Sequence, residues 1–490
     1  MRTSADYLAS FEDGRRVVVD GEPVKNVVEH PAFAPIAHTI GRLFDLAADP
    51  ANNMQTHDPA TGRAVNRLFL PPRDAEELAA YREAAQVWAT ETHGFVGRSP
   101  DHVGAFLAAF SSHPEAFADN RGPGKNLAEN VRAFHRRVVE NDLYVSYAII
   151  PPQVSRATTA HAWEGDFVQV GVKEERPDGI VVQGAQMLAT GGAVADEILV
   201  SCIKPLQAED EEFAVSFTVP VNADGLTLYC RRPYAPGASS EYDYPLSSRY
   251  DETDALLVFD EVFIPWESVF VYKDVPGLRK QFFGTGAHVL GNWQAQIRFA
   301  TKLRFMAGLA RKVAEVNGVD KFPGVVEKLG ELASLVSVVE SGVLAAEHTA
   351  DNDDQGLCRP GARALYGAMG LQSEIHPRVI GILRDLAGGG VLQLPASVEE
   401  LRNEATRAHM DRYVSSPGTP AEERIKLFKL VWDAIGSEFA GRHQQYELFY
   451  AGAPFVVKGY AYRNYGYDQP LAEVDDFLAS YSSTGTEAAR

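Results

Sequence analysis

The sequence has 490 residues and a formal net charge of −20, and 45% of its residues are hydrophobic. A chain of this length can bury large cores, and length alone suggests about three domains. The excess of negative charge disfavours nonspecific binding to nucleic acid or anionic membranes, because such binding needs basic patches. We therefore expect neither nucleic acid nor a membrane among the partners.

Apolar runs and cysteines point to an intracellular protein. Every apolar run is interrupted before the roughly 18 residues that suggest a membrane span, and the start of the chain lacks the apolar stretch of a secretory signal. The cysteines, Cys202, Cys230 and Cys358, lie far apart and form neither a disulfide framework nor a metal-binding pair. We expect reduced thiols, no metal site and a cytoplasmic location.

Helical spacing dominates the first third of the chain. In the segment 73–92, Asp74 and Glu77 have the spacing of a helix capping box. Apolar residues then recur on one helical face, at Leu78, Tyr81, Ala85 and Trp88. The segment therefore predicts an amphipathic helix.

From about residue 147 the pattern changes to that of β-strands. The strand-like segments are 167–172, 180–182, 213–219 and 255–259. Between the first two, the residues Arg176-Pro177-Asp178-Gly179 have turn chemistry, since proline fixes φ and glycine permits a positive φ. This middle region is predicted to be a β domain.

Helical spacing returns near Gly286 and predicts long helices at 288–316 and 421–449. The order is helical, then β, then helical, without the βαβ alternation of Rossmann or TIM folds. We predict an α+β chain with an N-terminal helical domain at 1–146, a central β domain at 147–275 and a C-terminal helical domain at 276–490.

Motifs for several common chemistries are missing from the sequence: it contains no HExxH, GxSxG or paired CxxC. What remains is polar residues inside apolar segments: Arg98 and His102 after Gly94-Phe95-Val96-Gly97, Tyr147 and Gln153 around Ile149-Ile150-Pro151-Pro152, and His288 and Asn292 one helical turn apart. Taken singly, each is more simply explained as a structural hydrogen-bonding or ion-pairing residue.

Together these segments resemble one known family. The stretches GFVGRSPD, IIPPQVSR, MLATGG, DEVFIPWESVF, AGGGVLQLPAS and IGSEFAGRHQQYELFYAGAP occur in its order over more than 400 residues. The chain is similar to the oxygenase components of 4-hydroxyphenylacetate 3-monooxygenases and chlorophenol monooxygenases.

The resemblance implies an acyl-CoA-dehydrogenase-like fold: an N-terminal helical domain, a central β-barrel-like domain, and a C-terminal four-helix bundle with a flavin-covering tail. It also implies a homotetramer that receives reduced FAD by diffusion from a separate NAD(P)H:flavin reductase. The expected reaction uses O2 and a flavin hydroperoxide to hydroxylate a small phenolic substrate next to its hydroxyl group. Such an intermediate survives only where water is excluded.

The family motifs carry over to residues of this chain. As catalytic residues they imply His288, Arg98, His102 and Tyr147, with His288 as the base or hydrogen-bond partner of the phenol. Arg98, His102, Cys202 and Ile203 are expected to border the substrate. The expected flavin-binding residues are Tyr147, Gln153, Val154, Ser155, Arg156, Thr190, Ala451, Gly452, Ala453 and Pro454.

One departure from the family pattern affects the expected substrate. In the 4-hydroxyphenylacetate enzymes the position of His102 is typically tyrosine and that of Tyr147 is typically histidine, so this chain has the two residue types exchanged. The C-terminal segment FYAGAPFVVKGYAYRNYGYD is closer to the chlorophenol branch. A halogenated phenol or a phenolic natural-product intermediate is therefore expected in preference to 4-hydroxyphenylacetate itself.

Two alternatives have other chemistry. 4-Hydroxybutyryl-CoA dehydratase is expected to share the fold but requires three cysteines and a histidine for an iron–sulfur cluster. At the matching positions only His288 is suitable, because Arg98, His102 and Ala295 replace the cysteines. A flavin-binding homologue without activity is the other alternative, and retention of Arg98 and His288 argues against it.

Overall fold

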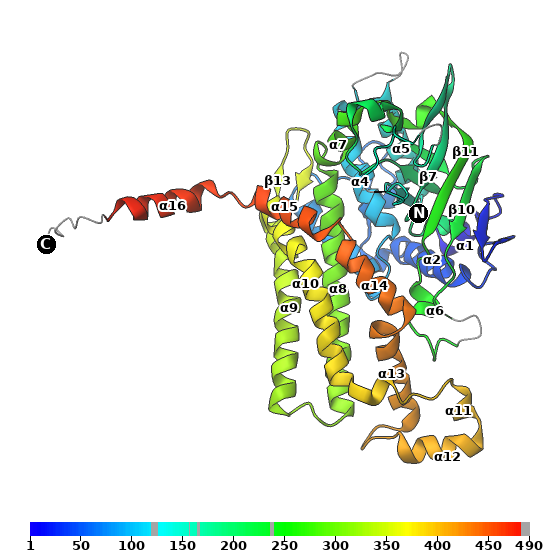
Figure 1. The fold of residues 1–490 in the computed structure, drawn as a ribbon, viewed down its shortest axis with the longest axis vertical. Helices are drawn as coiled ribbons and strands as arrows, with labels where there is room; N and C mark the ends of the chain where they lie inside the picture. The colour runs from blue at the N-terminus through cyan, green and yellow to red at the C-terminus, as the bar shows by residue number, and fades with distance from the viewer. Residues whose placement is uncertain (119–125, 156, 164–166, 236–239, 482–490) are drawn as a thin grey trace.

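A computed structural model describes residues 1–118, 126–155, 157–163, 167–235 and 240–481. Figure 1 shows a β-rich part packed beside the N-terminal helices, a bundle of long helices, and a C-terminal arm that leaves the body. The mixture of helices and strands in this arrangement confirms the predicted α+β class.

The N-terminal helices are α1 (Ser4–Ala9), α2 (Ala34–Ala48), α3 (Ala75–Glu91), α4 (Pro100–Ser112) and α5 (Leu127–Asn141). The predicted helix at 73–92 is thus α3. Its N-cap is Asp74, whose carboxylate accepts a hydrogen bond from the backbone N–H of Glu77 at 2.8 Å. The Glu77 carboxylate in turn accepts a bond from the backbone N–H of Arg73.

Strands between residues 17 and 271 form two main sheets. The six-stranded sheet has the order β2-β1-β10-β11-β7-β6, and the four-stranded sheet has the order β12-β9-β8-β5. The strands are β1 (Val17–Val19), β2 (Glu22–Pro23), β5 (Val145–Ala148), β6 (Gly171–Arg176), β7 (Gly179–Gln186), β8 (Glu197–Val200), β9 (Ser216–Pro220), β10 (Leu226–Cys230), β11 (Ala255–Pro265) and β12 (Val269–Val271). Short pairs are β3 (Gln55–His57) with β4 (Ala64–Asn66), and β13 (Asp351–Asn352) with β14 (Cys358–Arg359).

A barrel-like form was expected for the β region. The described strands instead form separate open sheets. The predicted hairpin is confirmed, because Pro177 and Asp178 connect β6 to β7. Two strand predictions are shifted. In 167–172 only the end belongs to β6, and in 213–219 a 3-10 helix at Ala208–Phe213 precedes β9.

The C-terminal bundle is built from α8 (Ala287–Val316), α9 (Pro323–His348), α10 (Ala362–Ala387), α13 (Ala421–Ile435) and α14 (Glu438–Phe449). Shorter helices are α6 (Ser247–Tyr250), α7 (Val275–Phe283), α11 (Glu399–Arg402), α12 (Glu404–Tyr413), α15 (Pro454–Asn464) and α16 (Asp468–Ala479). The predicted helix at 288–316 corresponds to α8.

The single helix predicted at 421–449 is wrong, because the chain breaks between α13 and α14. A Cβ on Gly436 would collide with the Trp432 ring, so the close approach there needs glycine. Ser437 then caps α14 by accepting a hydrogen bond from the backbone N–H of Ala440 at 3.1 Å. The break lets α14 turn toward the N-terminal helices (Figure 1).

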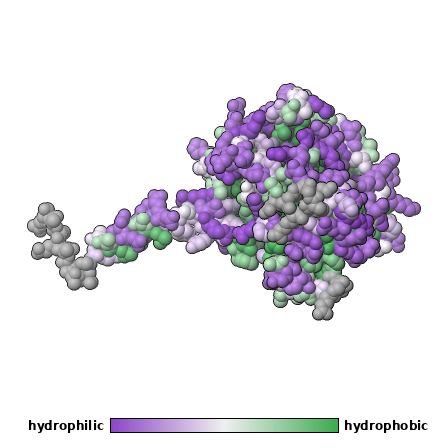
Figure 2. Space-filling model, turned by 90° about the horizontal axis from the view of Figure 1, so that it is seen from above, coloured by the Kyte–Doolittle hydropathy of each residue, from purple (hydrophilic) through white to green (hydrophobic). Residues whose placement is uncertain are grey.

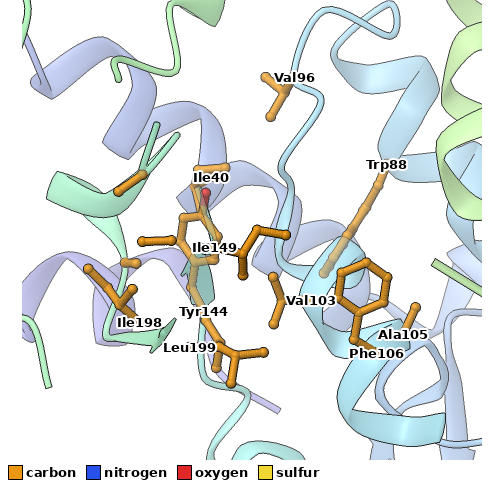
Figure 3. Close-up of a cluster of buried hydrophobic side chains, with 14 of the residues drawn as sticks. Ile40, Trp88, Val96, Val103, Ala105, Phe106, Tyr144, Ile149, Ile198 and Leu199 are labelled. Atoms are coloured by element: carbon orange, nitrogen blue, oxygen red, sulfur yellow. The ribbon is translucent and has the colours of Figure 1, made fainter. Parts of the chain in front are cut away.

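One continuous core joins the N-terminal helices to the four-stranded sheet. Figure 3 shows Trp88 of α3 and Phe106 of α4 on one side of the cluster, across from Tyr144 and Ile149, which flank β5, with Leu199 of β8 near Tyr144. All five side chains are buried. This packing fixes α4 and β5 relative to each other, and these two elements carry His102 and Tyr147 of the candidate site.

Helix α9 is apolar enough, by length and composition alone, to cross a membrane, and 28% of its most apolar window is buried. It packs against α8 and α10 on one side (Figure 1). Several apolar side chains of α9 are exposed, including those of Val326, Val338 and Leu344.

Candidate active site

The site begins with the loop at 94–99, which joins α3 to α4. The Glu252 carboxylate accepts hydrogen bonds from the backbone N–H groups of Gly97 at 2.8 Å and Arg98 at 2.6 Å. The hydroxyl of Tyr144 donates to the Arg98 carbonyl, and that of Tyr450 donates to the Gly97 carbonyl, each at 2.7 Å. These four bonds hold the loop and set the direction in which the Arg98 side chain leaves it.

The Arg98 guanidinium is buried among aromatic rings. Its carbon lies 3.9 Å from the ring centroid of Tyr450, 5.1 Å from that of Tyr147 and 5.4 Å from that of Tyr446. One amino group donates to His102 Nε2 at 3.0 Å and the other to the Tyr450 carbonyl at 3.1 Å. Burial lowers the pKa of Arg98, but the neighbouring tyrosines and Glu252 outweigh it and raise the pKa overall, so the cation is retained.

The hydrogen bonds of His102 define its tautomer. Because Arg98 can only donate, His102 Nε2 accepts, and Nδ1 carries the proton. Nδ1 donates to Gln294 Oε1 at 3.2 Å, and Gln294 Nε2 donates to the Asp101 carboxylate at 2.9 Å. Burial and the Arg98 charge lower the pKa of His102 well below its usual value. The imidazole is therefore neutral and presents Nε2 as an acceptor.

Tyr147 completes this cluster from β5. Its ring centroid lies 5.5 Å from that of His102 and 6.1 Å from that of Phe106. Burial raises the pKa of the Tyr147 hydroxyl, and Arg98 opposes that rise. The structure thus brings Arg98, His102 and Tyr147 together, as one cation, one neutral imidazole and one phenol.

His288 lies in the first turn of α8, and its recorded contacts run to a different set of residues. Its Nδ1 is 2.9 Å from the Tyr366 hydroxyl. Its ring stacks on Phe283 with centroids 4.6 Å apart and meets Tyr460 edge-on at 4.8 Å. Burial lowers the pKa of His288 to about 4, so this imidazole is also neutral near pH 7. None of the described contacts joins it to Arg98.

Three exposed apolar side chains lie on neighbouring segments: Val154, predicted at the flavin, Ile203, predicted at the substrate, and Leu188. Val154, Leu188 and Ile203 have exposed fractions of 62%, 47% and 50%. They lie on adjoining segments, because Met187 pairs with Ile150 and the Ile203 N–H donates to the Ile149 carbonyl. Large exposed apolar side chains grouped in this way fit a flat, apolar ring system.

The other expected flavin residues border these side chains or the Arg98 cluster. Gln153 is exposed and Ser155 is half-buried, whereas Arg156 lies outside the described residues. The Thr190 hydroxyl donates a hydrogen bond to the Asp254 carboxylate at 2.7 Å. Ala451, Gly452, Ala453 and Pro454 are half-buried and follow directly after Tyr450, which contacts Arg98.

Cysteine chemistry is not favoured at this site. Cys202 is buried, and burial raises the pKa of its thiol to about 11. Burial also raises the pKa of the thiols of Cys230 and Cys358. Among the described residues, no group of three or more His, Cys, Asp or Glu side chains could hold a metal ion.

A buried ion pair lies next to the Arg98 cluster, on the far side of Tyr450. The Glu447 carboxylate of α14 forms a bidentate ion pair with the Arg298 guanidinium of α8. Lys302 Nζ donates to the same carboxylate at 2.9 Å. The Arg298 guanidinium lies 4.6 Å from the Tyr450 ring centroid. Burial, opposed by Glu447, lowers the pKa of Lys302 to about 8. This pair joins α8 to α14 at the level of Tyr450.

Sequence reasoning missed Glu252, Tyr144, Gln294 and Tyr450, which position the predicted residues. Glu252 lies 154 residues from Arg98, and nothing in its own segment marks it as a partner of that loop. Gln294 had a weak signal, because it is a polar residue in the apolar helix segment that also holds His288.

Comparison with known proteins agrees with this geometry. The chain matches the model described as 4-hydroxyphenylacetate 3-hydroxylase N terminal over residues 3–271 and the C-terminal model over residues 278–479. It is 37% identical to the pyoverdin chromophore biosynthetic protein PvcC of Pseudomonas aeruginosa, over 92% of this chain and 89% of that protein.

Another relative is a monooxygenase of Streptomyces globisporus, whose name gives its substrate as a 3-amino-3-(3-chloro-4-hydroxyphenyl)propanoyl group on the peptidyl-carrier protein SgcC2. The identity is 35%, over 92% of this chain and 85% of that protein. Among solved structures, the oxygenase component of 4-hydroxyphenylacetate 3-monooxygenase, complexed with FAD and 4-hydroxyphenylacetate, superposes with a TM-score of 0.92. That match has 31% identity and covers 98% of this chain and 99% of the other.

The fold and the relatives define the chain as a flavin-dependent aromatic monooxygenase, the oxygenase component of a two-component hydroxylase. It belongs to the 4-hydroxyphenylacetate 3-hydroxylase family. The resemblance seen in the sequence is therefore confirmed.

Proposed function

We propose that this oxygenase hydroxylates a phenol at the carbon next to the hydroxyl group, and that its substrate is a phenolic intermediate of natural-product assembly or a halogenated phenol. The names of the relatives PvcC and the Streptomyces enzyme support a biosynthetic phenol. The exchange of residue types at His102 and Tyr147 supports a substrate other than 4-hydroxyphenylacetate.

One observation supports hydroxylation of a phenol as the reaction type. The Arg98 guanidinium is buried, yet no carboxylate among the described residues pairs with it, and it faces aromatic rings and His102 Nε2 instead. A buried cation whose side chain donates to no carboxylate favours an anionic ligand. A phenol placed against Arg98 would be stabilised as its phenolate, which raises the electron density of the neighbouring ring carbon.

Reduced FAD and O2, when bound, supply the electrophilic oxygen atom. The residues that would hold the flavin are Tyr147, Gln153, Val154, Ser155, Arg156, Thr190 and Ala451 to Pro454, and the exposed apolar face at Val154, Leu188 and Ile203 supports this placement. Cys202 and Ile203 would border the substrate. The reduced flavin would arrive from a separate NAD(P)H:flavin reductase in the cytoplasm, and the oxygenase would act as a homotetramer.

The proton acceptor has two candidates. His102 Nε2 could accept a proton once its hydrogen bond from Arg98 is broken, while the family resemblance points to His288, whose Nδ1 is hydrogen-bonded to the Tyr366 hydroxyl. We expect His102→Asn to lower the turnover of phenol and to change its pH profile. His288→Ala tests the base role predicted for His288: that role requires a larger loss of hydroxylation than of FAD binding, and normal turnover across neutral pH would exclude it.

A reconstituted assay tests the proposed function. The protein would be mixed with a generic flavin reductase, NADH, FAD and a panel of phenols, either free or attached to a carrier protein. Mass spectrometry should detect a product heavier by one oxygen atom, and NMR should place that oxygen next to the original hydroxyl. Hydrogen peroxide as the only product with every phenol would overturn the proposal.

A further inference from the structure

Asp101 is a buried carboxylate beside the Arg98 cluster. Most charged side chains lie on the outside of the protein, and the face of the body seen in Figure 2 is largely hydrophilic. Only 1% of Asp101 is exposed, and no cation among the described residues forms an ion pair with it. Burial raises the pKa of this carboxyl to about 6. Its negative charge near neutral pH therefore depends on the groups that donate hydrogen bonds to it.

Two side chains donate to the Asp101 carboxylate. The Ser99 hydroxyl donates to Oδ1, and Gln294 Nε2 of α8 donates to Oδ2 at 2.9 Å. The titratable groups that act on it from neighbouring elements are the phenols of Tyr81 in α3 and Tyr144 before β5. Burial raises the pKa of both phenols well above the usual value, so they carry no charge. The carboxylate is thus held by neutral side chains.

The hydrogen bonds between Arg98 and Asp101 all run in one direction. Arg98 donates to His102 Nε2 at 3.0 Å, and His102 Nδ1 donates to Gln294 Oε1 at 3.2 Å. Gln294 Nε2 then donates to Asp101. The chain begins at a buried cation whose side chain donates to no carboxylate and ends at a buried carboxylate without a cation. Hydrogen bonds aligned in this way polarise and strengthen one another.

We propose that Asp101 is a positioning residue for the hydroxylation: through Gln294 it holds His102 as the Nδ1–H tautomer, with Nε2 facing Arg98. In this role Asp101 is the distant counter-ion of Arg98. The inference rests on the proposed binding of the phenol at Arg98, because the chain of hydrogen bonds controls where that guanidinium lies.

The charge on Asp101 decides which way the Gln294 amide faces. An ionised carboxylate only accepts hydrogen bonds, so the amide NH2 group must face it and Oε1 must face His102. A neutral Asp101 can donate to Oε1 instead, which allows the amide to turn over and place its NH2 group against His102 Nδ1. The ring would then carry its proton on Nε2, where it opposes the donor of Arg98. Loss of the charge should therefore displace Arg98.

A simpler role for Asp101 would be purely structural. The residue lies in the first turn of α4, where a negative charge stabilises a helix through its dipole. That role predicts a loss of stability in Asp101 variants, but no dependence of their kinetics on His102.

A double-mutant cycle in the full-length protein separates the two roles. Asp101→Asn, His102→Asn and the double variant would be assayed for hydroxylation in the reconstituted system. We expect Asp101→Asn to lower kcat/KM by about tenfold on its own, but by less than about twofold in the His102→Asn background, where no ring tautomer remains to be fixed. Losses that simply multiply, or an unchanged kcat/KM in Asp101→Asn, would refute the positioning role.

The pH profile gives a second measurement. Wild-type kcat/KM should fall as the pH drops through about 6, where Asp101 becomes neutral, and Asp101→Asn should lack this fall. Asp433→Asn is the matched control, because Asp433 of α13 is a buried carboxylate held by the backbone N–H groups of Leu246 and Ser247, each at 2.8 Å. It should keep the wild-type profile. A fall that persists in Asp101→Asn, or that disappears in both variants, would contradict the proposal.

NMR of protein labelled with 15N-histidine needs neither turnover nor a stable Asp101 variant. The His102 signals are assigned by their absence from His102→Asn. Wild type should carry the His102 proton on Nδ1 at neutral pH and lose this form as the pH drops below the pKa of Asp101. A proton on Nε2 at neutral pH would exclude the proposed arrangement. Normal kinetics of Arg98→Met would instead contradict the proposed binding of the phenol, so the two failures are distinguishable.

Discussion

At the scale of single residues, Arg98 is the clearest determinant of chemistry. We expect Arg98→Met to lower kcat/KM for the phenol by about tenfold to a hundredfold, because a charge-assisted hydrogen bond contributes about 1.5–3 kcal/mol. The rate should also shift toward higher pH, since the phenol would lose the cation that favours its ionisation. Steady-state kinetics against pH measures both effects.

Arg311→Met is the matched control for this substitution. Arg311 is half-exposed in an ion pair with Glu315 on the surface of α8, so its loss should leave the kinetics unchanged. Equal kcat/KM for Arg98→Met and wild type would show that the phenol does not bind at this cation.

His288 makes a prediction about stability and pH. Its pKa of about 4 in the folded protein is lower than its usual value near 6.5, so the unfolded state binds more protons between these values. Stability should therefore rise with pH through this window, and His288 should contribute about 2 kcal/mol of the gain between pH 5 and 7. Denaturation of wild type and His288→Gln at both pH values should show a weaker pH dependence for the variant. An identical dependence would contradict the buried, neutral state of His288.

At the scale of elements, the loop at 94–99 must approach α14 closely. A Cβ on Gly97 would collide with the Tyr446 hydroxyl. We expect Gly97→Ala to displace the loop, reduce stability by about 1–3 kcal/mol, and lower kcat/KM by moving Arg98. Thermal denaturation and steady-state kinetics measure the two effects.

The control for that substitution is Gly308→Ala in α8, where a Cβ would meet nothing within 4 Å. Alanine should stabilise this helix by about 0.5–1 kcal/mol without changing kinetics. If both variants behaved alike, steric contact with Tyr446 would not be what fixes the loop.

Elements whose signals are local could be predicted from the sequence. Asp74 capping α3 and the Pro177–Asp178 turn each depend on residues a few positions apart. The clamp of Glu252 on Gly97 and Arg98 depends on residues more than 150 positions apart, so no spacing reveals it. The break at Gly436 was missed for a different reason: helical apolar spacing continues across it, and the contact with the Trp432 ring that requires glycine there is seen only in the folded structure.

At the scale of the whole molecule, the buried pair of Arg298 and Glu447 joins the bundle to the site. Glu447→Gln would leave Arg298 and Lys302 without a buried counter-charge, which costs about 3–5 kcal/mol. We expect a large fall in Tm in thermal denaturation. The exposed pair of Glu374 with Lys458 provides the control, because Glu374→Gln should change stability by less than about 1 kcal/mol. Similar losses in both variants would argue against a special role for the buried pair.

The order of helical and β regions could be predicted because periodicity changes along the chain. The order of the strands in the sheets could not be predicted, since strand pairing such as β1 with β10 joins residues that are far apart in sequence. The candidate site likewise has a part that the sequence predicts and a part that only the structure shows. Resemblance supplied Arg98, His102 and Tyr147, whereas their tautomer and charge state follow from Gln294 and the surrounding rings.

The three thiols have a consequence for how long the enzyme can work. Flavin oxygenases release hydrogen peroxide whenever reduced flavin reacts without a substrate, and peroxide oxidises thiolates rather than thiols. Burial raises the pKa of Cys202 to about 11 and that of Cys230 to about 12, and it also raises the pKa of Cys358. Very little thiolate exists near neutral pH, so the protein should withstand its own uncoupled turnover without protective reductants.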